Sequence, residues 1–169
     1  ILEFGADRPG DVRALARWYR PHIAVVTAVG DTPVHVEYYN DAEHVAREKS
    51  EIVRYLTSND YAVLNHDDSR VLAMKDATRG QVTTFGANEG ADVHFSNLTI
   101  HYNANGAPEG IAFKLHNDGS FVPVKIAGSL GSSQAYAAAA AAAVGTALGM
   151  NFIEISQAIE SYQPSRGVL

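Results

Sequence analysis

Two short apolar runs, separated by a long amphipathic segment, limit the folds open to this chain. Residues 23–27 (IAVVT) and 61–64 (YAVL) are rich in residues that favour strands. Both runs are continuous rather than alternating, which is typical of strands buried on both faces of a parallel sheet. The segment between them, about residues 41–56, carries apolar residues at helical spacing, with Asp41 as its expected N-cap. This strand–helix–strand order predicts an α/β protein with helices covering a mostly parallel sheet.

Further strands and helices are expected on both sides of this strand–helix–strand unit. Residues 1–4 form a short apolar run that we expect to be another strand, and a helix is expected from Asp11 to the residue before Pro21. Three β-like stretches, 93–102, 110–116 and 121–126, are separated by turn signals and predict a small antiparallel meander. Seven alanines at 137–143 predict a core helix packed on the sheet, and 152–162 a final amphipathic helix.

Composition removes several classes of protein. The chain has 169 residues, enough for one domain with a substantial core, and 46% of them are hydrophobic. Its net charge of −6 argues against a nucleic-acid partner, because phosphate backbones need clustered cations. The absence of cysteine excludes disulfides, thiolate metal sites and cysteine nucleophiles. There is no initiator methionine or signal-like segment, and we expect a piece of a longer protein.

Lys49 is the most informative single position. It falls within the apolar stripe of the 41–56 helix, four residues after Val45 and three before Ile52. A lysine on a buried face is costly unless it is paired or modified. The alternative is a side chain that extends past the core and keeps its ammonium in water.

Other candidates follow the expected strands. Glu3, beside Gly5, is either a solvated strand-end carboxylate or a ligand for a hard cation such as Mg²⁺. His35 lies in the loop after residues 23–27, and Asn65 follows 61–64, so all three are expected at the carboxyl edge of the sheet, where open parallel sheets bind ligands. Asp68 is expected to cap a helix. No G-x-x-x-x-G-K-[ST], G-x-S-x-G or H-E-x-x-H motif occurs.

Several segments together resemble the Mur ligase family. Residues 3–11 (EFGADRPGD) are similar to its E-[ML]-G-A-x-x-x-G-[DE] segment, and 21–27 (PHIAVVT) to its P-x-I-A-V-[IV]-T strand. The loop at 35–39 (HVEYY) resembles H-x-E-x-F, the helix at 46–52 (AREKSEI) resembles A-x-x-K-x-E-[IL], and 64–68 (LNHDD) resembles L-N-x-D-D. Each motif is modest alone, but their order and spacing make the set specific. The likeness is strongest to the branch that joins D-alanyl-D-alanine to UDP-MurNAc-tripeptide.

The resemblance implies an ATP-dependent amide-forming ligase of peptidoglycan precursor synthesis. In this family the middle domain binds ATP and Mg²⁺, and a carboxylate is phosphorylated to an acyl-phosphate that an amine then attacks. Carried over by motif, Glu3 and His35 hold Mg²⁺, and Lys49 is carbamylated so that it becomes an anionic Mg²⁺ ligand. Asn65, Gln134 and Arg166 are the expected nucleotide contacts.

The resemblance also sets expectations for organisation and partners. Residues 1–162 correspond to part of the middle domain, with an antiparallel insert at about 82–127, and 163–169 to a linker. The family's phosphate-binding loop is expected before residue 1, and the chain alone is expected to be inactive. UDP-MurNAc-peptide and D-Ala-D-Ala would bind through other domains, in a cytoplasmic monomer with neither nucleic-acid nor membrane partners.

Two departures from the family pattern keep alternatives open. Leu130 stands where the family has histidine, and Val168 where its arginine is expected. These residues favour a degenerate, non-catalytic binding domain. A third possibility is another amide ligase of the superfamily, similar to folylpolyglutamate or cyanophycin synthetases, although residues 6–10 (ADRPG) favour the D-Ala-D-Ala branch.

Overall fold

The structure is a computed structural model that describes residues 1–32 and 37–162. The chain divides into two compact units, Ile1–Thr83 and Thr84–Leu169. Each unit is described by itself.

Unit 1 contains the predicted strand–helix–strand arrangement. Its elements are α1 (Asp11–Tyr19), β1 (Ile23–Val26), α2 (Ala42–Arg54), β2 (Tyr61–Asn65), α3 (Ser69–Leu72), the 3₁₀ helix η1 (Ala73–Ala77) and the start of β3 (Gln81–Gly86). Strands β1 and β2 are parallel, with Ile23 opposite Tyr61 and Val26 opposite Leu64. Asp41 caps α2 as expected, because its side chain accepts a hydrogen bond from the His44 amide at 2.7 Å.

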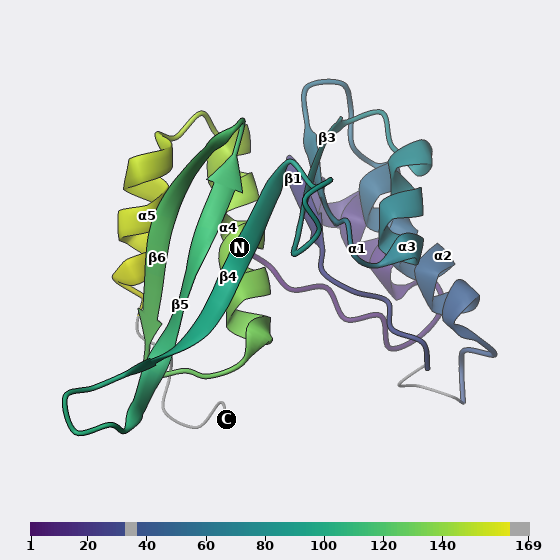
Figure 1. The fold of residues 1–169 in the computed structure, drawn as a ribbon. Coiled ribbons are helices and arrows are strands. Elements are labelled where there is room, and N and C mark those ends of the chain that lie inside the picture. Colours follow the sequence, from purple (N-terminus) through teal and green to yellow (C-terminus); the bar gives the residue numbers. More distant parts are fainter. Residues whose placement is uncertain (33–36, 163–169) are drawn as a thin grey trace. The chain divides into compact units, whose positions relative to one another are not determined.

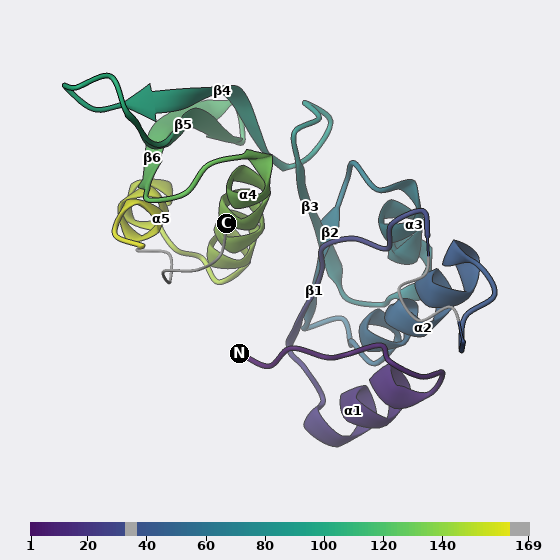
Figure 2. The same ribbon diagram turned by 90° about the horizontal axis from the view of Figure 1, so that it is seen from below.

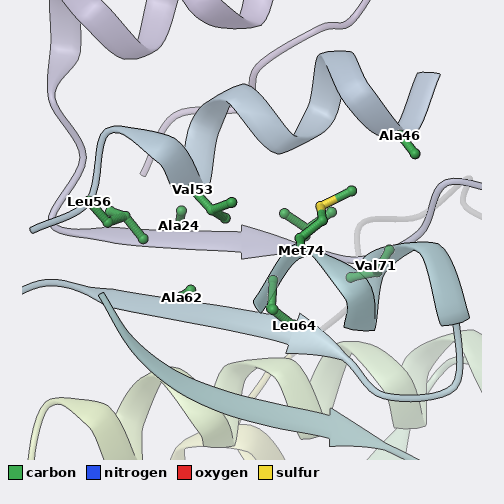
Figure 3. Packing of buried hydrophobic residues seen from close by; sticks show 9 residues of the cluster. Ala24, Ala46, Val53, Leu56, Ala62, Leu64, Val71 and Met74 are labelled. Carbon is green, nitrogen blue, oxygen red and sulfur yellow. The ribbon is translucent and has the colours of Figure 1, made fainter. Parts of the chain in front are cut away.

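The core of unit 1 lies where α2 covers β1 and β2 (Figure 3). Val53 in the last turn of α2 and Leu56 just after its C-cap are fully buried, as is Leu64 on β2. Val71 and Met74, from α3 and η1, close the same cluster. Full burial of one such side chain contributes about 1.5–3 kcal/mol, so this cluster fixes α2 against β1 and β2.

The expected strand at residues 1–4 is wrong. Residues 1–6, all of which the structure describes, form no strand, and the side chains of Ile1 and Leu2 are exposed. A β-rich run becomes a strand only when a neighbour pairs with its backbone amides and carbonyls. Within the described part of the chain, no strand pairs with these residues.

Unit 2 combines the antiparallel meander with the two C-terminal helices. The end of β3 pairs in parallel with β4 (Val93–Tyr102), and β4, β5 (Pro108–Asn117) and β6 (Ser120–Ala127) are antiparallel. Helices α4 (Ser132–Ala147) and α5 (Phe152–Glu160) cover one face of β4–β6 in both views (Figures 1 and 2). The tight turn before β6 uses Asp118 and Gly119, both with positive φ, as its sequence predicted.

The alanine-rich segment is a core helix, as expected. Ala139, Ala142 and Ala143 are fully buried, because their small side chains let α4 approach its neighbours closely. Tyr136 on α4 meets Phe95 on β4 edge to face, with ring centroids 5.0 Å apart. The helix therefore packs on the meander rather than extending into solvent.

The predicted α/β class is confirmed, although the antiparallel strands are the longest ones. The sequence patterns did not anticipate β3 or η1, which are short and lack a clear hydrophobic period, whereas α3 begins at the cap expected at Asp68. In the ranges 1–32 and 37–162, no helix is long and apolar enough to cross a membrane.

Candidate functional site

Three side chains converge on the segment that follows β1, residues 27–30. The first comes from Asn65, the last residue of β2, whose Nδ2 donates to the carbonyl of Thr27 at 2.7 Å. Asn65 Oδ1 in turn accepts from the amide of Asp67 at 2.9 Å. The buried amide therefore ties the carboxyl ends of β1 and β2 together and keeps one Nδ2 proton for a further partner.

Lys49 reaches the next residue of the same segment. Its Nζ donates to the carbonyl of Ala28 at 2.6 Å, so the amine of α2 lies at the carboxyl end of β1. The side chain is half-buried, and this desolvation lowers the pKa of Lys49, while the nearby Asp68 carboxylate raises it less. The structure thus gives a lysine that is neither fully buried nor extended freely into water. At a given pH, a larger fraction of Lys49 is therefore in the neutral amine form than of an ordinary surface lysine.

Asp68 completes the convergence. It caps α3 as predicted, since Oδ1 accepts from the amides of Arg70 and Val71 at 3.0 and 3.1 Å. Its other oxygen accepts from Val29 at 2.8 Å and more weakly from Gly30 at 3.5 Å. Burial by itself would raise the pKa of Asp68, but these backbone hydrogen bonds outweigh it and lower the pKa. A permanent carboxylate therefore holds the β1 loop in place beside Lys49.

Arg70 links the same region to α2. Its Nε donates to Glu43 at 2.6 Å and its guanidinium to Asp31 at 3.1 Å. The loop from β1 is therefore anchored at Val29 by Asp68, the N-cap of α3, and at Asp31 by Arg70 of α3.

Glu48, next to Lys49, is a buried residue that the sequence patterns missed. Its two carboxylate oxygens accept from the amides of Gly10 and Val12 at 2.9 and 2.8 Å, at the start of α1. Gly10 occupies the N-cap of α1 and has no side chain to perform this role. A glycine N-cap before an amphipathic helix was the available signal that a distant acceptor must exist.

The remaining predicted residues have different outcomes. Glu3 is exposed, is not on a strand, and makes no hydrogen bond or ion pair with the described residues. His35 and Arg166 lie outside the described residues. The shared carboxyl edge is therefore seen for Asn65, whereas the strand-end argument for Glu3 does not hold. The roles assigned to Glu3, His35, Lys49, Asn65, Gln134 and Arg166 stay predictions.

Gln134 belongs to unit 2, in the first turn of α4. It is half-buried and lines an apolar cleft of about 370 Å³ with residues of β6, α4 and α5, among them Ile126, Ala138 and Ile155. Its side-chain amide is the one amide side chain in that lining, so it would orient any ligand with polar edges.

The described residues around Lys49 do not by themselves supply enough ligands for a metal ion. Within residues 1–32 and 37–162, no three His, Cys, Asp or Glu side chains are grouped as a metal site. A carbamylated lysine would add an anionic oxygen ligand of the kind that Mg²⁺ prefers. The position of Lys49 and its lowered pKa fit that modification.

Comparisons with known proteins agree with this architecture. Residues 1–145 match the Mur ligase middle domain family. The UDP-N-acetylmuramoyl-tripeptide–D-alanyl-D-alanine ligase of Mycobacterium bovis is 29% identical over 164 residues, which cover 97% of this chain and 31% of the relative. The chain therefore spans under a third of the length of this curated relative.

Two solved structures have the same fold. MurF from Acinetobacter baumannii superposes with a TM-score of 0.82 at 24% identity, covering 96% of this chain and 34% of that one. MurF ligase from Thermotoga maritima, in complex with ADP, superposes with a TM-score of 0.79 at 26% identity, covering 98% and 36%. With the family match extending over residues 1–145, this chain belongs to the Mur ligase middle domain family.

Proposed function

We propose that this chain is the ATP- and Mg²⁺-binding part of a ligase that adds D-Ala-D-Ala to UDP-MurNAc-tripeptide. The observation that carries the proposal is Lys49, because a family match over residues 1–145 coincides with a half-buried amine of lowered pKa at the carboxyl end of β1. The name of the Mycobacterium bovis relative supports the choice of substrates. In this proposal residues 1–162 form part of one middle domain, with 163–169 as a linker.

Carbamate formation at Lys49 requires the neutral form of its amine. The neutral Nζ attacks the carbon of CO₂, a C–N bond forms, one C=O electron pair moves to oxygen, and Nζ loses a proton to solvent. Only the unprotonated amine has the lone pair for this step, so a lowered pKa at Lys49 favours it. The product keeps one N–H, which can still donate to the Ala28 carbonyl.

The other residues have roles in binding. Glu3, His35 and carbamylated Lys49 hold Mg²⁺, which when bound neutralises charge on the transferring phosphoryl group. Asn65 and Arg166 contact the nucleotide. Gln134 offers a donor and an acceptor beside apolar walls, which suits the edge of a purine ring.

The reaction then proceeds in two steps. The terminal carboxylate of UDP-MurNAc-tripeptide attacks the γ-phosphorus of ATP, and ADP leaves. The amine of D-Ala-D-Ala attacks the resulting acyl-phosphate, an amide bond forms, the nitrogen loses one proton to solvent, and phosphate leaves with the electron pair of the broken C–O bond. Positioning by all parts of the ligase is required, so this chain alone should show no turnover. The ligase would act as a cytoplasmic monomer.

Carbamylation can be tested on this chain without measuring turnover. The chain is equilibrated with ¹³C-bicarbonate at mildly alkaline pH, and the carbamate carbon is observed by ¹³C NMR. We expect a carbamate signal, distinct from that of the Ile1 α-amine, that is lost in Lys49→Arg and retained in Lys75→Arg, a lysine of η1 outside the site. A full set of carbamate signals in Lys49→Arg, or only the α-amine signal in the unchanged chain, would overturn the role of Lys49.

The substrate assignment needs the full-length ligase. ADP release is measured with UDP-MurNAc-tripeptide and D-Ala-D-Ala, and separately with folate and glutamate or with arginine and aspartate. We expect release only with the first pair, and a loss of at least about a hundredfold in Lys49→Arg. Release with another pair would move the protein to a different ligase of the superfamily.

A non-catalytic binding domain is the second candidate. Leu130 is 44% exposed directly before α4, and the N-cap of α4, Gly131, has no capping side chain. If the full-length protein binds ATP but releases no ADP with any of these substrates, this second function is the correct one.

A further inference from the structure

Unit 1 contains a cleft at the end of α1 that is lined by arginines, unlike the apolar cleft beside Gln134 in unit 2. It has a volume of about 960 Å³, which is large enough for a small organic ligand. Its lining combines one face of α1 with the residues just before β1 and β2 and the end of α2. The lining residues that carry the argument are Arg13, Arg17, Arg20, His22, Tyr55 and Asp60.

Three arginines give this cleft its character. Arg13, Arg17 and Arg20 are spaced four and three residues apart, so they follow one face of α1 and its C-cap. Arg13 is loosely paired with Glu51, with Nε 3.9 Å from the carboxylate oxygen. Among the described residues, Arg17 and Arg20 make no ion pair or side-chain hydrogen bond. Two unpaired guanidiniums on a chain of net charge −6 are a local excess of positive charge.

The backbone at Arg20 adds to this observation. Arg20 has φ 46° and ψ 73°, in the left-handed region that favours glycine after a helix. A glycine would adopt this conformation without the steric cost of a Cβ atom. With arginine there, the helix ends with a guanidinium at the cleft.

Asp60 is the one carboxylate in the lining, and both of its oxygens already have hydrogen-bond partners. Asp60 accepts from the amide and hydroxyl of Thr57 at 2.7 and 2.6 Å, and its other oxygen lies 2.9 Å from Nδ1 of His22. The Thr57 hydrogen bonds and His22 lower the pKa of Asp60 to about 2. The carboxylate is therefore buried and held by these partners, and it leaves the arginines free for a ligand.

The cleft is separate from the candidate site around Lys49. Pro21 and His22 directly precede β1, and Asp60 directly precedes β2, so the cleft lies at the amino ends of the two parallel strands. Lys49 contacts Ala28, beyond the carboxyl end of β1. The four residues of β1 lie between His22 and Thr27, which are therefore about 16 Å apart along the extended chain.

We propose that this cleft is a second anion site, which binds a small phosphorylated molecule through Arg17 and Arg20. Guanidinium groups form paired, charge-assisted hydrogen bonds with phosphate oxygens. The half-buried ring of Tyr55 offers an apolar wall for the organic part of such a ligand. The volume exceeds what a single phosphate needs, which favours a phosphorylated metabolite over an inorganic ion.

Inorganic pyrophosphate serves as the probe, with binding measured by calorimetry on this chain at low salt. Trp18, the single tryptophan, is exposed on α1 next to Arg17 and gives an independent fluorescence reading. We expect saturable binding, weakened about tenfold or more in Arg17→Glu and in Arg20→Gly. Arg20→Gly also relieves the left-handed backbone, so a loss of binding with unchanged or higher Tm cannot come from unfolding.

Arg47→Glu is the matched control, because Arg47 is an exposed arginine of α2 that does not line the cleft. It should change the affinity less than twofold at fixed salt. Absence of pyrophosphate binding, or equal weakening by Arg47→Glu, would overturn the proposal. Lys49→Arg should leave this binding intact, which separates the outcome from that of the ligase proposal.

Discussion

The carboxylate of Glu48 on α2 holds the amide of Val12 on α1 at 2.8 Å. The second oxygen of the same carboxylate accepts from Gly10, so one buried side chain closes the start of a helix 36 residues away in sequence. Glu48 also directly precedes Lys49, so the residue that orients α1 and the candidate reactive lysine share one turn of α2.

Replacing Glu48 should destabilise unit 1. In Glu48→Gln an amide NH₂ faces a backbone N–H, and one buried donor loses its acceptor. We expect the free energy of unfolding to fall by about 1–3 kcal/mol, measured by urea denaturation. Glu51→Gln on the same helix loses only loose, partly exposed ion pairs and should cost less than about 0.5 kcal/mol. Equal losses in the two variants would mean that the caps on α1 contribute nothing.

The buried hydroxyl of Tyr39 should lower the free energy of unfolding, whereas the carboxylate of Glu48 raises it. The residue is 2% exposed, and its hydroxyl has no hydrogen-bond partner among the residues described. Burial, with added repulsion from Glu48, Asp11 and Asp7, raises the pKa of Tyr39 to about 12. Tyr39→Phe removes an unsatisfied buried group, and we expect stability to stay equal or to rise by up to about 1 kcal/mol.

Tyr38→Phe is the control for that variant. Tyr38 is exposed, and Arg8 lies over its ring with the guanidinium carbon 5.4 Å from the centroid, a contact that phenylalanine keeps. It should leave the free energy of unfolding unchanged. A clear loss of stability in Tyr39→Phe would show that the hydroxyl has a partner of structural importance.

His116 should make unit 2 sensitive to mild acid. Its ring stacks on His94 with centroids 4.5 Å apart, and Nε2 lies 2.8 Å from the Ser96 hydroxyl. Burial lowers the pKa of His116, with smaller effects from His94 and Lys114 and an opposing one from Glu89. Because the folded state prefers the neutral ring, this stability is present above the unfolded pKa of about 6.5 and is lost as pH falls below it.

The measurement is the Tm between about pH 7.5 and pH 5. The fall in Tm should be smaller in His116→Gln than in the unchanged chain, because glutamine does not titrate. His101→Gln, at a partly exposed position of β4 where the ring lies 3.6 Å from Glu109, should leave most of the original pH dependence in place. The prediction fails if both variants follow the same curve.

Two glycines in unit 2 should respond differently to alanine. A Cβ on Gly110 would collide with the backbone carbonyl of Ile126 on the paired strand, which cannot move without breaking the β5–β6 ladder. We expect Gly110→Ala to cost about 2–3 kcal/mol in urea denaturation. A Cβ on Gly145 would lie 2.8 Å from Cδ1 of Ile155, the mobile end of a side chain.

Gly145→Ala is therefore the milder variant. Its crowding is offset by the higher helix propensity of alanine, which is worth about 1 kcal/mol in a helix interior. A net change within about 1 kcal/mol is expected. If Gly145→Ala proved the more damaging substitution, the α4–α5 contact would be tighter than the β5–β6 ladder.

The accuracy of the sequence predictions followed the range of the interactions involved. Asp41 at the start of α2 and the Asp118–Gly119 turn were predicted correctly, because capping and turn chemistry depend on residues a few positions apart. The run at residues 1–4 has the same local β preference as β1 but forms no strand, because pairing depends on a partner far away in sequence.

The candidate site shows the same division. Lys49 was recognised because it breaks a helical apolar stripe, a pattern visible within one helix. Its acceptor at Ala28 and the clamp from Asp68 to Val29 could not be predicted, since each joins residues 21 or 39 positions apart.

By itself, the sequence determined the family, the α/β class, most helix and strand positions and the choice of Lys49 as the central residue. Only the tertiary structure decided that Lys49 lies at the carboxyl end of β1, that Glu48 is buried against α1, and that Arg17 and Arg20 line a cleft with Asp60 turned to other partners. Periodicity, capping and turn signals involve residues close together in the chain, so they can be recognised from the sequence alone. Burial, pKa shifts and clefts depend on which distant atoms displace water around a side chain, and that arrangement exists only after the chain has folded.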